Sequence, residues 1–118
     1  MDLSTGIENG LKIISVKDAR IDAAVAIEFK DAMRSATADG MPVVILDLGA
    51  VQFIDSSGLG AIVAAMKQMG PGRTLALAGL TTTVEKVFRL TRMDSVFKVF
   101  QTLDAAKVDL APENTTLG

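Results

Sequence analysis

The residues best placed for chemistry are two adjacent serines, Ser56 and Ser57, which stand between Asp55 and Gly58. The apolar run 43–48 upstream is typical of a buried strand. Apolar residues at helical spacing follow the serines: Leu59, Ile62, Val63 and Met66. The Asp55–Gly58 turn is therefore predicted at a helix N-terminus, where free amides and the helix dipole stabilise negative charge. Such a turn is a suitable place to add or remove a phosphate.

Two interpretations of this turn remain open from the residues alone. Ser or Asp before a helix commonly caps its first amides, so Ser57 can be a structural cap. Alternatively, Ser57 is phosphorylated and gains ~1.5–2 negative charges near pH 7, which the helix start tolerates while Asp55 repels them. Gly58 and Gly60 each cost a helix about 1 kcal/mol relative to alanine. Their presence indicates that another backbone or a ligand approaches closely there.

Composition argues against catalysis. The chain has no histidine and no cysteine, which removes a Ser–His dyad, a thiol nucleophile and the commonest metal ligands. Lys67 lies about three turns along the same expected helix and is too far away to act as a base for Ser57. Gly58-Leu59-Gly60 does not continue into a dinucleotide fingerprint, because Val63 occupies the place of the third glycine. We therefore expect a protein that is not an enzyme and has no catalytic residues, metal site or cofactor.

Charge and hydropathy limit the partners. Twelve basic and fourteen acidic residues are interspersed for a net charge of −2, and there is no Tyr or Trp to stack on bases, so nucleic acid is a poor candidate. No apolar run approaches the ~20 residues of a membrane span, and no basic region leads into an apolar stretch at the start. We expect no membrane insertion, no signal peptide and a cytoplasmic protein.

The element order is β-β-α-β-α-β-α-β-α. The expected strands are residues 3–7, 11–16, 43–48, 74–78 and 96–100, with a hairpin turn at Asn9-Gly10. The expected helices begin after caps at Asp22, Ser57, Thr82 and Thr102. This alternation predicts an α/β fold with a mixed sheet of about five strands and right-handed crossovers. Residues 1–108 are predicted to form a single domain and residues 109–118 a flexible tail.

These segments resemble a known family. Leu46-Asp47-Leu48, followed by Val51 to Gly60 with its Asp-Ser-Ser-Gly, resembles the phosphorylation segment of STAS domains, specifically bacterial anti-sigma factor antagonists. The resemblance extends over residues 11–107 and implies the STAS fold and a partner-switching function. The unphosphorylated form would bind an anti-sigma factor that is also a serine kinase of the histidine-kinase-like ATPase fold. Phosphorylation would release it, and a metal-dependent serine phosphatase would reset the switch.

The resemblance also assigns roles to residues. The second serine of the pair, Ser57, matches the phosphorylated position; Asp55 is expected to order the turn and Ser56 to pack or cap. Candidate partner-binding residues are Arg20, Asp22, Leu59 and Gly60. The family usually has a glycine where this chain has Ala19-Arg20, so the identity of the partner stays open. The alternative is a STAS scaffold or accessory subunit of a stressosome-like or lipid-transport complex, although lipid-transport relatives usually lack the full Asp-Ser-Ser-Gly.

Overall fold

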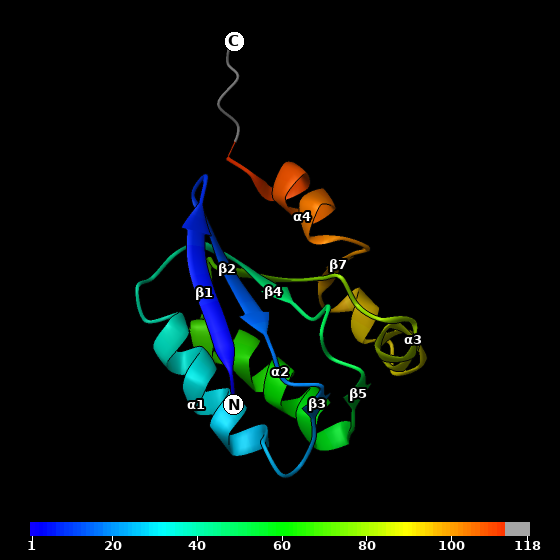
Figure 1. Cartoon of the computed structure of the whole chain (residues 1–118). Helices are drawn as coiled ribbons and strands as arrows, with labels where there is room; N and C mark the ends of the chain where they lie inside the picture. Colours follow the sequence, from blue (N-terminus) through cyan, green and yellow to red (C-terminus); the bar gives the residue numbers. More distant parts are fainter. Residues whose placement is uncertain (113–118) are drawn as a thin grey trace.

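A five-stranded mixed sheet with helices on both faces forms the body of the molecule (Figure 1). The computed structural model describes residues 1–112. The strands of the sheet are β1 (Leu3–Glu8), β2 (Leu11–Val16), β4 (Val43–Asp47), β6 (Thr74–Ala78) and β7 (Lys98–Phe100), in the order β1-β2-β4-β6-β7. Only the pairing of β1 with β2 is antiparallel; β2, β4, β6 and β7 run parallel. The predicted α/β class and mixed sheet are confirmed.

The helices divide unequally between the two faces of the sheet. They are α1 (Ala26–Ala36), α2 (Ser56–Met69), α3 (Thr82–Leu90) and α4 (Leu103–Leu110), with a short 3-10 helix at Met93–Ser95. Helices α1 and α2 pack side by side on one face, and α4 lies across the other (Figure 1). A separate two-stranded parallel ladder joins β3 (Arg20–Ile21) to β5 (Phe53–Ile54). Sequence patterns did not predict this ladder, because each strand has only two residues.

The hairpin between β1 and β2 follows from its turn residues. Asn9 and Gly10 both have positive φ, at 51° and 78°, the left-handed conformation that Asn and Gly tolerate best. The predicted hairpin is confirmed, with Leu3 opposite Val16 and Glu8 opposite Leu11.

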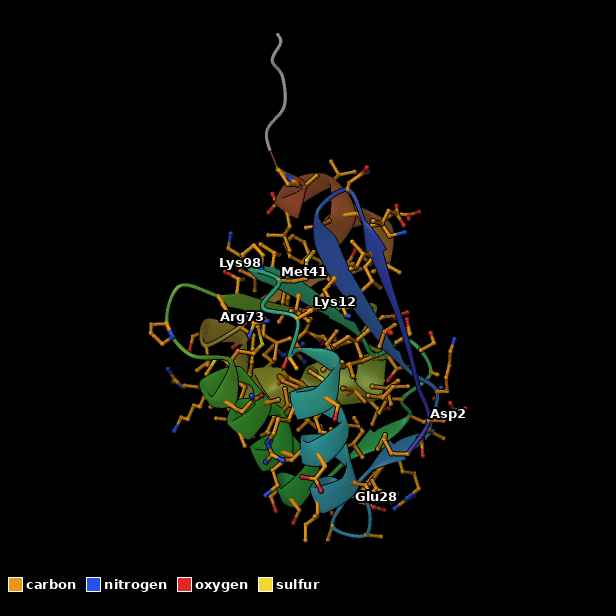
Figure 2. All side chains as sticks on the ribbon, turned by 90° about the vertical axis from the view of Figure 1, so that its left-hand side faces the viewer. Asp2, Lys12, Glu28, Met41, Arg73 and Lys98 are labelled. Carbon is orange, nitrogen blue, oxygen red and sulfur yellow. The ribbon has the colours of Figure 1, made fainter. Side chains whose placement is uncertain are left out.

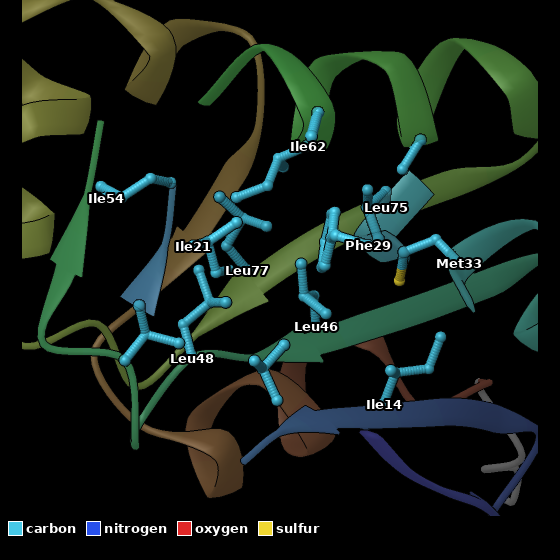
Figure 3. Close-up of a cluster of buried hydrophobic side chains, with 14 of the residues drawn as sticks. Ile14, Ile21, Phe29, Met33, Leu46, Leu48, Ile54, Ile62, Leu75 and Leu77 are labelled. Atoms are coloured by element: carbon cyan, nitrogen blue, oxygen red, sulfur yellow. The ribbon is translucent and has the colours of Figure 1, made fainter. Parts of the chain in front are cut away.

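The main core lies between the sheet and helices α1 and α2. Side chains from the central strands meet those of both helices in one cluster (Figure 3), which includes Ile14, Phe29, Met33, Leu46, Ile62, Leu75 and Leu77. On the opposite face, Ile45 packs with Leu11, Ala78 and Ala106 of α4. Strand β4 is thus covered on both faces, which explains why its sequence is apolar without alternation. Burying one large side chain in this way contributes about 1.5–3 kcal/mol.

Arg73 links the segments that precede β4 and β6 through hydrogen bonds. Its Nε donates to the Met41 carbonyl at 2.9 Å, and a terminal nitrogen donates to the Thr37 carbonyl at 2.9 Å, which satisfies backbone oxygens in the segment after α1. Figure 2 labels Arg73 and Met41 at this end of the sheet. Lys12 pairs nearby with Asp39 at 2.8 Å. These contacts stabilise the end of the sheet where β4 begins. The Asp55–Gly58 turn lies at the opposite end.

Three predicted starts of elements were wrong. Strand β7 begins at Lys98 rather than at residue 96. Asp22 does not cap α1: the chain makes another turn first, with the Val25 amide bonded to the Asp22 carbonyl at 3.1 Å, and α1 begins only at Ala26. The cap of α3 is Thr81 rather than Thr82.

Helix α4 continues to Leu110, two residues past the predicted domain end at 108; the bounds of the domain themselves stay a prediction. The part of the predicted tail from residue 113 onward lies outside the described residues.

Within residues 1–112, no helix combines the length and the apolar character needed to cross a membrane.

Candidate functional site

The Asp55–Gly58 turn is held beyond the carboxyl end of β4 by the small β3–β5 ladder. After Asp47, the chain passes the buried residues Leu48 and Val51 and enters β5, which leads directly into α2. In the ladder, Ile21 pairs with Ile54, and both are buried. The turn is therefore fixed on both sides: by β5 before it and by α2 after it. Its predicted place beyond the carboxyl end of a parallel strand, where α/β sheets commonly carry functional groups, is confirmed.

Asp55 is the N-cap of α2. Its backbone is extended (φ −105°, ψ −175°), and its Oδ1 accepts a hydrogen bond from the Gly58 amide at 2.8 Å. Its Oδ2 accepts from the Ala23 amide at 3.2 Å. One carboxylate thus joins the start of α2 to the segment that follows β3. This geometry fits the expected role of ordering the turn.

Electrostatics at this carboxylate favour its charged form. The hydrogen bond from the Gly58 amide is the main reason that the pKa of Asp55 lies below its ordinary value of 3.8. The amides of Ala23 and Ser57 and the charge of Arg20 act in the same direction, while partial burial opposes them. Asp55 is therefore a carboxylate at neutral pH, two residues from Ser57.

The two serines are the first residues inside α2, and both are exposed. The interpretation of Ser57 as the helix cap is wrong, because a cap must precede the helix with an extended backbone, a position that Asp55 occupies. The expectation that Ser56 packs or caps is also wrong, because its side chain is exposed to solvent at the first position of α2. Among residues 1–112, neither hydroxyl has a hydrogen-bond partner.

Gly58 is buried where the backbone of β3 meets α2. A Cβ at this position would overlap the carbonyl oxygen of Ile21 and would lie 3.0 Å from a side-chain carbon of Ile54. The prediction that another backbone approaches a glycine here is confirmed for Gly58. For Gly60, which is exposed, no atom of residues 1–112 lies within 4 Å of where its Cβ would be, so no backbone approaches it there, and the approach of a ligand to Gly60 stays a prediction. The neighbouring Leu59 is half-buried against the main core.

Arg20 and Asp22 lie beside this turn and pair with each other. Arg20 Nε donates to Asp22 Oδ2 at 3.1 Å, and the other oxygen of Asp22 accepts from the Ala24 amide at 3.1 Å. The guanidinium lies over the ring of Phe53, 4.3 Å from its centroid. The turn, Phe53, Arg20 and the exposed start of α2 form one continuous region, built from two segments that are about 30 residues apart in the chain.

The sequence did not predict two groups that contribute to this region: the Ala23 amide and the Phe53 ring. Their roles depend on the register of the β3–β5 ladder, which pairs Arg20 with Phe53. The one available signal was Phe53 itself, a large apolar residue that alternates with buried Ile54 and is 37% exposed.

A hollow in the surface lies elsewhere. It has a volume of about 630 Å³ and is lined by residues of α3, β7 and their neighbours, including Thr82, Glu85, Asp94 and Thr102. The Asp55–Gly58 turn does not line it. No group of three potential metal ligands occurs among residues 1–112. The turn is therefore a feature of the surface outside this hollow.

Fold and turn together define a STAS domain. The sequence model of the STAS domain matches residues 4–106, and the chain belongs to the STAS-domain family.

The relatives are consistent with this assignment. The anti-sigma-F factor antagonist RsfB of Mycobacterium tuberculosis is 26% identical over 98 residues, which are 83% of this chain and 80% of RsfB. An anti-sigma factor antagonist from Mycobacterium paratuberculosis is 25% identical, with a TM-score of 0.85 over 94% of each chain. The fold is also that of the Bacillus cell fate determinant SpoIIAA in its phosphorylated form, which is 17% identical, with a TM-score of 0.66 over 92% of this chain and 99% of SpoIIAA.

Proposed function

We propose that this protein is an anti-sigma factor antagonist whose binding to an anti-sigma factor is controlled by phosphorylation of Ser57. The observation that carries the proposal is that Asp55 and Ser57 have different roles at the start of α2. Asp55 caps the helix, so the exposed Ser57 hydroxyl has no structural task among residues 1–112. A hydroxyl of this kind can be modified without removing a contact that the fold needs.

The proposed phosphate is compatible with the fold but not with a docked partner. At the start of α2 the dianion meets the positive end of the helix dipole. A partner lying against the same helix start would have to bury that charge, at a large desolvation cost without a matching cation. Ser57 is therefore the proposed modification site, and Arg20, Asp22, Leu59 and Gly60 are proposed to lie in or beside the contact.

The relatives support the class of partner. RsfB and the M. paratuberculosis protein carry the name of anti-sigma factor antagonist, and SpoIIAA has been solved in a phosphorylated form. For this chain, the proposed partner is an anti-sigma factor that is also a serine kinase of the histidine-kinase-like ATPase fold. A metal-dependent serine phosphatase would restore the unmodified form, and all of these proteins would meet in the cytoplasm. The chain is then a substrate of these enzymes rather than an enzyme itself.

The test combines phosphorylation with binding. The protein is incubated with its cognate kinase and ATP, and mass spectrometry should find one phosphate, on Ser57. Ser57→Ala should stay bound to the kinase in the presence of ATP, and Ser57→Asp should bind weakly. Ser56→Ala is the matched control, since it removes a neighbouring hydroxyl that is equally exposed, and it should still switch.

Two results would contradict the proposal. One is a phosphate at another residue together with normal switching of Ser57→Ala. The other is affinity purification that returns permease subunits and no kinase, which would favour an accessory subunit of a transport complex.

A further inference from the structure

Arg20 uses little of its hydrogen-bonding capacity. A guanidinium has five N–H donors, and the one engaged here is Nε, which donates to Asp22. No acceptor within the described part of the chain contacts its terminal nitrogens. The side chain is 60% exposed, and its Cζ lies over the Phe53 ring, 4.3 Å from the centroid. The fork of the guanidinium, the part that matches a phosphate with two parallel hydrogen bonds, is therefore unoccupied among residues 1–112.

The backbone around Arg20 brings it to the start of α2. Arg20 pairs with Phe53, two residues before Asp55, in the β3–β5 ladder. The next residue, Ile21, places its carbonyl against Gly58, and the Ala23 amide donates to Asp55. Residues 20–23 thus border the Asp55–Gly58 turn along its length. The positive charge of Arg20 is close enough to lower the pKa of Asp55.

We propose that Arg20 is the counter-ion of a phosphate on Ser57 within the same molecule. This inference rests on the proposed function and adds to it a role for one residue. On phosphorylation, the terminal nitrogens of Arg20 bind the phosphate oxygens, and the guanidinium turns away from Asp22.

Charge explains why the exchange is favourable. The pair of Arg20 with Asp22 is exposed and single-bonded, and such pairs contribute little. A phosphate dianion that accepts two hydrogen bonds from the guanidinium is the stronger partner. Because Asp22 and Asp55 both carry negative charge beside the turn, a nearby cation also offsets the repulsion that they exert on the phosphate.

The exchange would change the binding surface at two points. A docked partner would meet the negative charge at Ser57 and would also lose the positive charge that Arg20 presents beside it. Asp22 would be left with its contact to the Ala24 amide alone. One modification thereby alters both segments that form the region.

The test measures the second ionisation of the phosphoserine. Protein with phosphoserine incorporated at residue 57 during translation is titrated by ³¹P NMR, without any kinase. A nearby cation favours the dianion and lowers this pKa, so Arg20→Ala should raise it by about half a unit, as expected for an exposed ion pair. Arg20→Lys should restore part of the shift, because lysine keeps the charge but lacks the fork. Arg34→Ala, which removes an arginine that pairs with Asp31 on α1, is the matched control and should leave the value unchanged.

A second readout reports on Arg20 directly. The ¹⁵Nε resonance of Arg20 should move between the unmodified and the phosphorylated protein, as its partner changes from Asp22 to phosphate. Equal phosphoserine pKa values in the wild type and Arg20→Ala, with an unmoved ¹⁵Nε resonance, would overturn the inference. Since the phosphoserine is installed without a kinase, that result would leave the proposed function standing, whereas failure of the kinase to modify Ser57 would overturn the function alone.

Discussion

The carbonyl oxygen of Ile21 lies where a side chain at residue 58 would have to be, so Gly58 allows the backbone of β3 to touch the first turn of α2. This contact accompanies two hydrogen bonds between the same segments: the Ala23 amide donates to Asp55, and the Asp55 amide donates to the Ile21 carbonyl at 3.4 Å. The close approach holds the segment of residues 20–23 against the turn that carries the serine pair. The shape of the site thus depends on a residue that has no side chain.

Gly58→Ala should destabilise the domain by about 3 kcal/mol, because the new methyl group meets rigid backbone rather than a flexible side chain. Gly60→Ala, two residues further along the same helix, is the matched control. It finds open space among residues 1–112 and should stabilise the protein by about 1 kcal/mol through helix propensity. Urea denaturation followed by circular dichroism measures both. Equal effects of the two substitutions would show that Ile21 does not constrain residue 58.

Thr81→Ala should cost about 1–2 kcal/mol of stability, since the Thr81 hydroxyl caps α3 through the Val84 amide and also donates to the Val51 carbonyl at 3.1 Å. Thr82→Ala should change the free energy of unfolding by less than about 0.5 kcal/mol, because Thr82 is exposed inside the first turn. The same denaturation experiment compares them. If Thr82→Ala lost more stability than Thr81→Ala, Thr82, the residue that the sequence pattern favours, would be the cap of α3.

The sequence predicted the fold well because the strong signals are local. Alternation, the Asn9-Gly10 turn and helical spacing each lie within a few residues, and together they give the class, the order of the main elements and the place of the turn. The errors at Asp22 and Ser57 have a common physical source. Asp22, Asp55 and Ser57 are all acceptable caps by residue type, and the choice among them depends on the contact between the Ala23 amide and Asp55, 32 residues apart. Long-range contacts of this kind have no local pattern.

Asp55→Asn should reduce the dependence of stability on acid pH. The folded-state pKa of Asp55 lies below 3.8, so its charged form is favoured by folding; its contribution is complete above that value and is lost as the pH falls through the folded-state pKa. The difference in unfolding free energy between the wild type and Asp55→Asn should therefore shrink as the pH falls below 3.8.

Asp39→Asn provides the comparison for that measurement. The pKa of Asp39 is also lowered, chiefly by its hydrogen bond from Lys12, at the opposite end of the sheet. Asp39→Asn should reduce the dependence of the unfolding free energy on acid pH independently of Asp55. The double variant should show the sum of the two effects. A difference between wild type and Asp55→Asn that stays constant down to pH 2 would show that the Asp55 carboxylate is not held in its charged form by the turn.

Ser57→Asp should leave the domain folded and slightly more stable, because a negative charge in the first turn of α2 interacts favourably with the helix dipole. The expected gain is about 0.3–1 kcal/mol at low salt, reduced by repulsion from Asp55. Ser35→Asp is the matched control: Ser35 is equally exposed but lies in the last turn of α1, where the same charge should destabilise by a similar amount. Thermal unfolding at low and high salt measures both, and the two effects should converge toward zero as salt screens the dipole. If Ser57→Asp instead unfolds the domain, weak binding by that variant would reflect lost structure, and the proposed switch would lose its physical basis.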